Sequence, residues 1–319
     1  MSNPIIRRVE LSIPGTMGFG NAYAIVNGER AALIDTGMAS AQNVDALQTQ
    51  LGKWGHTFGS LDKVVCTHFH PDHCGLSRQF QDAGTDVFLS STDAAALEFW
   101  QQSASVDRRM ATFYGEHPLP SNFSSSVLPS FSFLRSLQEE FHPCILGSDG
   151  SLVDLAGIPF EVIETPGHTD GHVCLLQREM NVLITGDHVL PNTIVNIAFG
   201  QQSRFDSALS QYMQSLRRLA LLGPLDVYPG HGIPFKNLAT RCLDLLQQHR
   251  QKVQQVLDAL TLKPVGAFEL SCLVFGEKRR PFSKWLNMAQ TISCLEYLAL
   301  QQQASCLQKG NMLYYMRVE

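Results

Sequence analysis

A cluster of three histidines and one aspartate within six residues constrains this chain more than any other feature. His68, His70, Asp72 and His73 follow directly after the apolar segment 63–66, which we expect to be a short buried strand. Because side chains two residues apart on an extended segment point the same way, His68 and His70 can bind one ion. Asp72 and His73, at the turn into a helix, face a slightly different point. The spacing therefore indicates two adjacent metal sites, each of which needs further ligands.

Three further candidate ligands each follow a predicted strand later in the chain. They are His168, Asp187 and His231, and glycine stands directly beside each of them in the sequence. Strand ends at one edge of a sheet converge, and glycine lets the backbone approach where a Cβ would obstruct. Imidazole and carboxylate ligands suit zinc, and also iron or manganese. So many polar ligands do not serve stability, because without metal they would repel one another and lie desolvated.

The hydrophobic pattern predicts two strand-rich halves, each followed by helices. Residues 9–13 alternate apolar and polar side chains, and segments 22–26 and 31–34 flank Asn27-Gly28, a strong hairpin turn. Further strands are expected at 63–66, 86–89, 152–153, 159–164, 173–176, 181–185 and 226–228, and helices after 37, near 74–83 and over 206–222. This order favours two sheets packed together with helices outside.

Two segments depart from this alternation of strands and helices. Residues 92–147 predict a helical insertion, with a helix from 94 to about 114, an irregular stretch rich in proline and serine over 118–129, and an aromatic-rich segment over 131–141. Such an insertion forms a lid or binding wall, or else a solvent-facing elaboration.

The pattern over residues 236–319 predicts a helix to about 262, helices around 266–275 and 282–302, and two short terminal stretches. Three helices and a hairpin describe a small winged-helix-like module, so the chain is expected to divide into 1–235 and 236–319.

Taken in chain order, the motifs are Ile34-Asp35-Thr36-Gly37, then His68-Phe69-His70-Pro71-Asp72-His73, and then His168, Asp187 and His231. These motifs resemble those of the metallo-β-lactamase-fold hydrolase superfamily, and the match covers residues 5–235. The resemblance implies an α+β fold, a four-layer αβ/βα sandwich with a dinuclear site at one edge. It places His68, His70 and His168 in site one, Asp72, His73 and His231 in site two, and Asp187 as the bridge. Asp35 would steady a ligand or its loop. The metal motifs are similar to those of glyoxalase II-like thioesterases and lactonases, and the C-terminal pattern resembles the branch with a winged-helix tail.

The function that this resemblance implies is hydrolysis at a pair of divalent ions, zinc first, with iron or manganese as alternatives. A metal-bridging hydroxide would attack an ester-type carbonyl in a thioester, a lactone or a related small acyl substrate. The acidic half over 1–235, with a net charge of −10, and the aromatic insertion favour this class. Asp72 would accept or relay a proton, as in relatives, and the chain has no GxSxG nucleophile. Asn192, Asn196 and Tyr114 are candidate substrate contacts.

Other functions stay open on the sequence alone. Residues 236–319 carry a net charge of +5, which leaves a metal-dependent endoribonuclease acting on single-stranded RNA as the alternative. A metal-bearing sensor or a dimerising scaffold is a third class, and the tail would form a homodimer interface or close over the active site. No apolar run approaches the roughly 18–20 residues of a membrane span. The eight cysteines are scattered, and the N-terminal sequence does not resemble an export signal, so we expect reduced thiols in a cytoplasmic protein.

Overall fold

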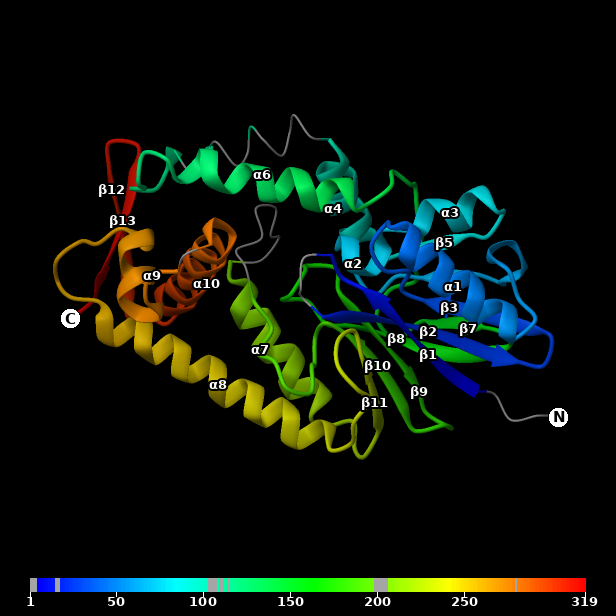
Figure 1. Cartoon of the computed structure of the whole chain (residues 1–319). Helices are drawn as coiled ribbons and strands as arrows, with labels where there is room; N and C mark the ends of the chain where they lie inside the picture. The colour runs from blue at the N-terminus through cyan, green and yellow to red at the C-terminus, as the bar shows by residue number, and fades with distance from the viewer. Residues whose placement is uncertain are drawn as a thin grey trace.

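The computed structural model describes residues 5–14, 18–102, 108, 112–113, 115–197, 206–278 and 280–319. Two β sheets lie face to face, and helices cover the outer side of each sheet (Figure 1). Three apolar layers result, one between the sheets and one between each sheet and its helices. The expected α+β sandwich with four layers is therefore confirmed.

The first sheet begins antiparallel and continues parallel. Its strands, in spatial order, are β1 (Ile5–Ser12), β2 (Phe19–Asn27), β3 (Arg30–Ile34), β4 (Val64–Val65), β5 (Val87–Leu89) and β6 (Cys144–Ile145). Side chains alternate between the two faces, so on β2 Ala24 packs towards the helices and Ile25 towards the second sheet. The outer helices here are α1 (Ala41–Lys53) and α3 (Ser77–Asp82), with a short helical turn η1 (Phe58–Ser60). Because β3 and β4 are parallel, the residues that follow them lie at the same edge.

The second sheet brings three more strand ends to that edge. Its spatial order is β11 (Asp226–Pro229), β10 (Val182–Gly186), β9 (Val173–Gln177), β8 (Ile158–Glu164) and β7 (Leu152–Leu155). β9 is antiparallel to both β8 and β10, and β10 is parallel to β11, so β8, β10 and β11 share one direction. A hydrogen bond from Val173 N to Thr67 O at 3.0 Å joins the two sheets beside this edge. The loops after β4, β8, β10 and β11 therefore meet.

The insertion differs from its predicted form. Helix α4 (Ser91–Gln101) begins close to the predicted position, but the stretch expected to be irregular contains the first half of a second helix, α6 (Phe123–Ser136), with Pro129 inside it. Phe123, Val127 and Phe131 are buried on the side of α6 that meets the C-terminal helices. This apolar packing outweighs the unfavourable propensities of proline and serine. The end of the insertion, β6, pairs with β5 and so extends the first sheet.

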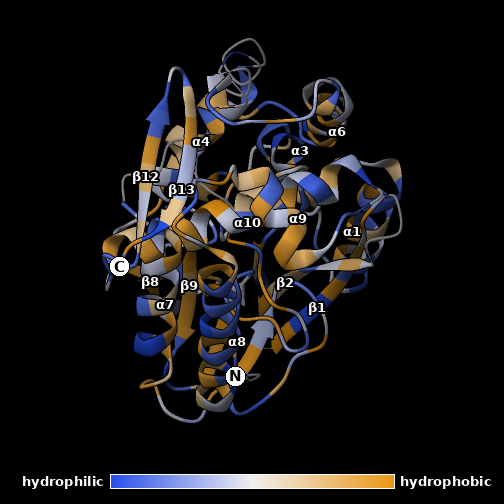
Figure 2. Ribbon diagram, turned by 90° about the vertical axis from the view of Figure 1, so that its left-hand side faces the viewer, coloured by the Kyte–Doolittle hydropathy of each residue, from blue (hydrophilic) through white to orange (hydrophobic). Residues whose placement is uncertain are grey.

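The C-terminal region follows its predicted order. Helices α8 (Leu238–Ala259), α9 (Ala267–Phe275) and α10 (Pro281–Leu300) precede a hairpin of β12 (Ala304–Lys309) and β13 (Met312–Arg317). Figure 2 shows hydrophilic turns along α8 beside the more hydrophobic α9 and α10. The apolar cluster that holds these helices also contains α7 (Ala208–Leu219), which covers the second sheet. Apolar packing thus crosses residue 235, and both the division there and the winged-helix likeness stay predictions. The described part of the chain contains no helix with the length and hydrophobicity of a membrane span.

Candidate metal centre

The seven predicted ligands come together at the common edge of the two sheets. His68 and His70 follow β4, and Asp72 and His73 lie on α2 (Pro71–Cys74), a single helical turn that Pro71 starts. The other three follow strands of the second sheet, as His168 follows β8, Asp187 follows β10 and His231 follows β11. Their potential ligand atoms form two groups, and within each group all of these atoms lie within 4.8 Å of one another.

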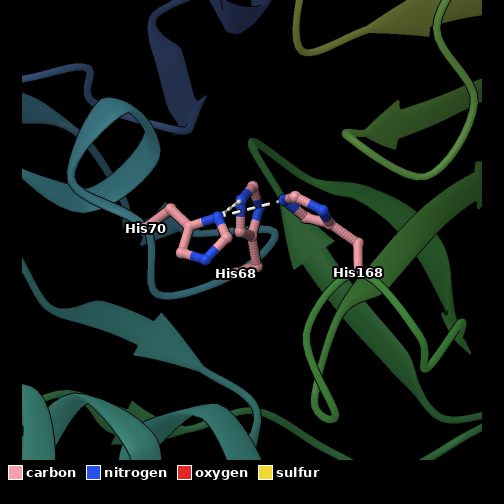
Figure 3. Close-up of side chains that lie close together, drawn as sticks. All are labelled: His68, His70 and His168. Carbon is pink, nitrogen blue, oxygen red and sulfur yellow. Dashed lines mark hydrogen bonds between the residues drawn. The ribbon is translucent and has the colours of Figure 1, made fainter. Parts of the chain in front are cut away.

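The first group consists of His68, His70 and His168. Nδ1 of His70 lies 3.1 Å from Nε2 of His68 and 3.0 Å from Nε2 of His168. Figure 3 shows the three rings turning these nitrogens towards one point, two from the loop after β4 and one from the opposite sheet. Burial, and then the neighbouring His168, lower the pKa of His70 to about 3. Burial also lowers the pKa of His68 and that of His168, so the three rings stay neutral, as metal ligands must be.

The second group consists of Asp72, His73, Asp187 and His231. Nε2 of His231 lies 3.2 Å from Oδ2 of Asp72 and 3.3 Å from Oδ2 of Asp187, and Nε2 of His73 lies 3.3 Å from Oδ1 of Asp187. Burial opposes protonation of His73, but the carboxylates of Asp187, Asp35 and Asp72 raise its pKa to about 10. Burial likewise opposes protonation of His231, but the carboxylates of Asp187 and Asp72 raise its pKa. Without a metal, both histidines therefore hold protons where a cation would otherwise balance the carboxylates.

Two buried atoms at the junction of the groups show that the residues fit metal ions. Nε2 of His73 and Oδ1 of Asp187 lie 3.3 Å apart without the geometry of a hydrogen bond, and neither atom has another hydrogen-bond partner in the described part of the chain. A buried polar atom without a partner is costly, and a bound cation would satisfy both. Asp187 also reaches the first group, since its Oδ2 lies 3.7 Å from Nε2 of His168. Nitrogen and carboxylate donors in this arrangement suit two adjacent divalent ions.

Asp35 and His172 support the ligands from behind. Asp35 accepts a hydrogen bond from Thr67 N at 2.7 Å, and its Oδ2 lies 2.8 Å from Nδ1 of His73. This contact directs Nε2 of His73 towards the second group. Nε2 of His172 accepts from the backbone N of Asp187 at 3.2 Å, and its Nδ1 lies 2.8 Å from the hydroxyl of Thr165. The carboxylate of Asp35 and the imidazole of His172 thus each contact a candidate ligand, and the steadying role of Asp35 stays a prediction.

Glycine is required beside the ligands because the loops approach so closely. A Cβ on Gly230 would lie 2.4 Å from Oδ1 of Asp187 and 2.7 Å from Cε1 of His73. Gly186 has φ +46°, and a Cβ there would lie 2.7 Å from Oγ1 of Thr67. The expectation that glycines permit close approach therefore agrees with the geometry.

Sequence reasoning missed Asp93, a fully buried residue in the first turn of α4. Its Oδ2 accepts from the backbone N of Phe69 at 3.1 Å and from the hydroxyl of Thr169 at 2.7 Å, and its Oδ1 accepts from Gly171 N at 2.8 Å. Burial raises the pKa of Asp93 to about 6, although these donors oppose the shift. Ser90 and Asp93 have the spacing of a helix start, which is the only signal that the sequence offers for this position.

The three candidate substrate contacts are less closely tied to the metal centre than the candidate ligands are. Asn192 and Asn196 are both exposed on the segment after Asp187. Asn196 approaches the centre through its backbone, since its carbonyl oxygen lies 3.2 Å from Nδ1 of His168. Tyr114 lies outside the described residues. Substrate contact by these three residues stays a prediction.

Comparisons with known proteins agree with this geometry. The sequence model of the metallo-beta-lactamase superfamily matches residues 15–231 of this chain. The chain belongs to this superfamily. Its family membership and its ligand set make it a metal-dependent hydrolase. The crystal structure of a metallo-beta-lactamase family protein from Thermus thermophilus is 27% identical, with a TM-score of 0.81 over 98% of both chains. A beta-lactamase domain protein from Burkholderia ambifaria, 20% identical, shares the fold with a TM-score of 0.83 over 98% of this chain and 92% of its own.

Two curated relatives extend the comparison. The probable metallo-hydrolase YqjP of Bacillus subtilis is 26% identical over 96% of this chain and 97% of its own length. The atrochrysone carboxyl ACP thioesterase of Aspergillus fumigatus is 26% identical over 81% of this chain and 65% of its own length. The chain therefore spans nearly the whole of the first relative and about two thirds of the second.

Proposed function

We propose that this superfamily member hydrolyses an ester-type carbonyl, in a thioester, a lactone or a related small acyl compound, with two zinc ions in the adjoining ligand groups. The observation that carries the proposal is the position of Asp187. One of its oxygens lies 3.3 Å from Nε2 of His73 and the other 3.7 Å from Nε2 of His168, so one carboxylate reaches both groups. A shared carboxylate is the arrangement expected where two ions act on one reacting centre.

The bound ions would supply Lewis acidity that lowers the pKa of a coordinated water and polarises the substrate carbonyl. The chain's own residues handle the proton. Oδ2 of Asp72 lies 3.2 Å from Nε2 of His231, and its side chain is 22% exposed, so this carboxylate is placed at the edge of the second group where it can accept a proton from the attacking water. Asp35, at 2.8 Å from Nδ1 of His73, keeps that ligand oriented while the proton moves.

An acyl substrate is favoured over the alternatives by the relatives and by charge. One relative is named as an ACP thioesterase, and a metal-activated water is a nucleophile that can cleave a thioester. The net charge of −10 over residues 1–235 does not favour a polyanionic RNA strand. We therefore place thioesters and lactones ahead of RNA.

A substrate panel tests the proposal. Zinc-loaded protein is assayed with thioesters, lactones, nitrocefin and single-stranded RNA, alongside chelated protein and the variant Asp187→Ala. We expect turnover of a thioester or a lactone that falls more than about 100-fold in the chelated protein and in the variant. Asp154→Asn, at an exposed ion pair with Arg30, is the matched control and keeps full activity. Turnover of RNA alone, or of none of these substrates, would overturn the proposal.

A further inference from the structure

The segment after Asp187 is fastened to the C-terminal helices through its backbone. Arg241 on α8 donates from Nε to the carbonyl of Leu190 at 2.7 Å and from Nη2 to the carbonyl of Thr193 at 2.8 Å. Further along, Ile197 donates its backbone N–H to Oε1 of Gln290 at 3.4 Å, and its carbonyl accepts from the hydroxyl of Ser293 at 2.8 Å. Residues 190–197 therefore lie between the metal centre and helices α8 and α10.

The last peptide of this segment touches a candidate ligand. The carbonyl oxygen of Asn196 lies 3.2 Å from Nδ1 of His168, while Nε2 of the same ring faces His70 at 3.0 Å. A carbonyl can only accept, so Nδ1 must carry the proton and Nε2 must present its lone pair. Hydrogen bonds of this kind select the tautomer and ring orientation that a metal ligand needs.

Gln290 and Ser293 occupy buried positions where a polar side chain without a hydrogen-bond partner would destabilise the fold. Their exposed fractions are 3% and 0%, and α10 neighbours such as Ile292 and Leu295 belong to the apolar core. A buried amide and a buried hydroxyl need partners, and Ile197, itself fully buried, provides one for each. Residues three apart lie on one face of a helix, so both side chains reach the same peptide segment.

We propose that Gln290 and Ser293 are positioning residues for the metal centre. By binding both backbone groups of Ile197 they hold the adjacent carbonyl of Asn196 against His168, and α10 thereby sets the affinity of the first group for its ion. The C-terminal region is then part of the metal centre, although it contributes no ligand. This inference rests on the metal centre proposed above and goes beyond the reaction assigned to it.

The test uses zinc binding to the full chain, without any substrate. Gln290→Met keeps the length of the side chain without its acceptor, and Ser293→Ala removes the donor. Each chain is stripped of metal, loaded with zinc and titrated with a chelator, and the zinc retained per chain is measured. His168→Ala and His231→Ala mark the loss of the first and second sites. We expect the double variant to bind the first ion about 10–100-fold more weakly and the second ion normally.

Thr291→Ala is the matched control on the same helix. Thr291 is fully buried, and its hydroxyl donates to the carbonyl of Asn287 within α10 rather than to residues 190–197. This variant should keep both ions. Equal loss of zinc in Thr291→Ala and the double variant would overturn the inference, because the cause would then be general loosening of α10. Wild-type zinc affinity in the double variant would also overturn it. Failure of the unmodified chain to bind two ions would instead overturn the proposed function.

Discussion

Asp93 shows at the scale of a single residue how the first ligand group is held together. Its three donors belong to two loops, because Phe69 lies between His68 and His70 while Thr169 and Gly171 follow His168. The two loops come from opposite sheets. One buried carboxylate therefore connects the two halves of a three-histidine site.

Replacing Asp93 with asparagine tests this connection. An amide has one acceptor oxygen, so either Gly171 N or the pair of donors on Phe69 and Thr169 loses its partner. We expect the unfolding free energy to fall by about 1–3 kcal/mol, since a buried donor is left unsatisfied. Zinc retention at the first site should fall as well. Urea unfolding and zinc content measure the two effects, and unchanged values in both would contradict the role. Asp82→Asn, at an exposed pair with Arg78, serves as the control.

At the scale of the element, the short helix α2 depends on the residue that follows it. Gly75 closes α2 with φ −60°, so any residue could adopt this backbone conformation. The space around it is what excludes a side chain. A Cβ there would lie 2.5 Å from Pro71 O, 2.6 Å from Leu137 O and 2.7 Å from Gly37 O. These are backbone atoms, which cannot rotate away.

Gly75→Ala should therefore displace α2 and with it Asp72 and His73. We expect a loss of at least about 2 kcal/mol in stability and weaker zinc binding at the second site. Gly52→Ala is the matched control, because nothing lies within 4 Å of a Cβ at Gly52 on α1. That change should stabilise the chain by about 0.5–1 kcal/mol. Thermal unfolding and zinc titration of both variants check the prediction, and equal stability of the two would contradict it.

At the scale of the whole molecule, one apolar core connects the sandwich with the C-terminal helices. Leu209 and Leu216 of α7, Leu245 of α8, Leu295 of α10 and Phe131 of α6 belong to the same buried cluster. Removing residues 236–319 would expose the outer face of α7 and the inner face of α6. Exposed apolar surface of this extent promotes aggregation.

A chain that ends at residue 235 should accordingly aggregate or unfold at a lower urea concentration than the full chain. Size-exclusion chromatography and urea unfolding measure this, and co-expression of residues 236–319 as a separate fragment should partly restore a soluble complex. A monomeric 1–235 fragment with full zinc binding would show that the two parts are independent. It would also remove the physical basis for α10 as a positioning element.

Much of the fold was predictable because its elements carry strong periodic patterns. The helix predicted over 206–222 is α7 at Ala208–Leu219, and the one predicted over 282–302 is α10 at Pro281–Leu300. Helix α6 was not predictable, since Pro129 and the serines before it argue against a helix and only packing against the C-terminal helices offsets them. Pairing of β6 with β5 was missed for a related reason, because a two-residue strand has no period to detect.

The sequence by itself determined which side chains meet at the metal centre. Histidine and aspartate have distinctive chemistry, and their positions directly after apolar strands place them at one edge of the sheets. Only the tertiary structure decided what orients them. His168 is oriented by the carbonyl of Asn196, and the loops of the first site are joined by Asp93. A backbone carbonyl has no sequence signature, and a contact between residues 76 positions apart, such as Asp93 with Thr169, exists only once the chain has folded.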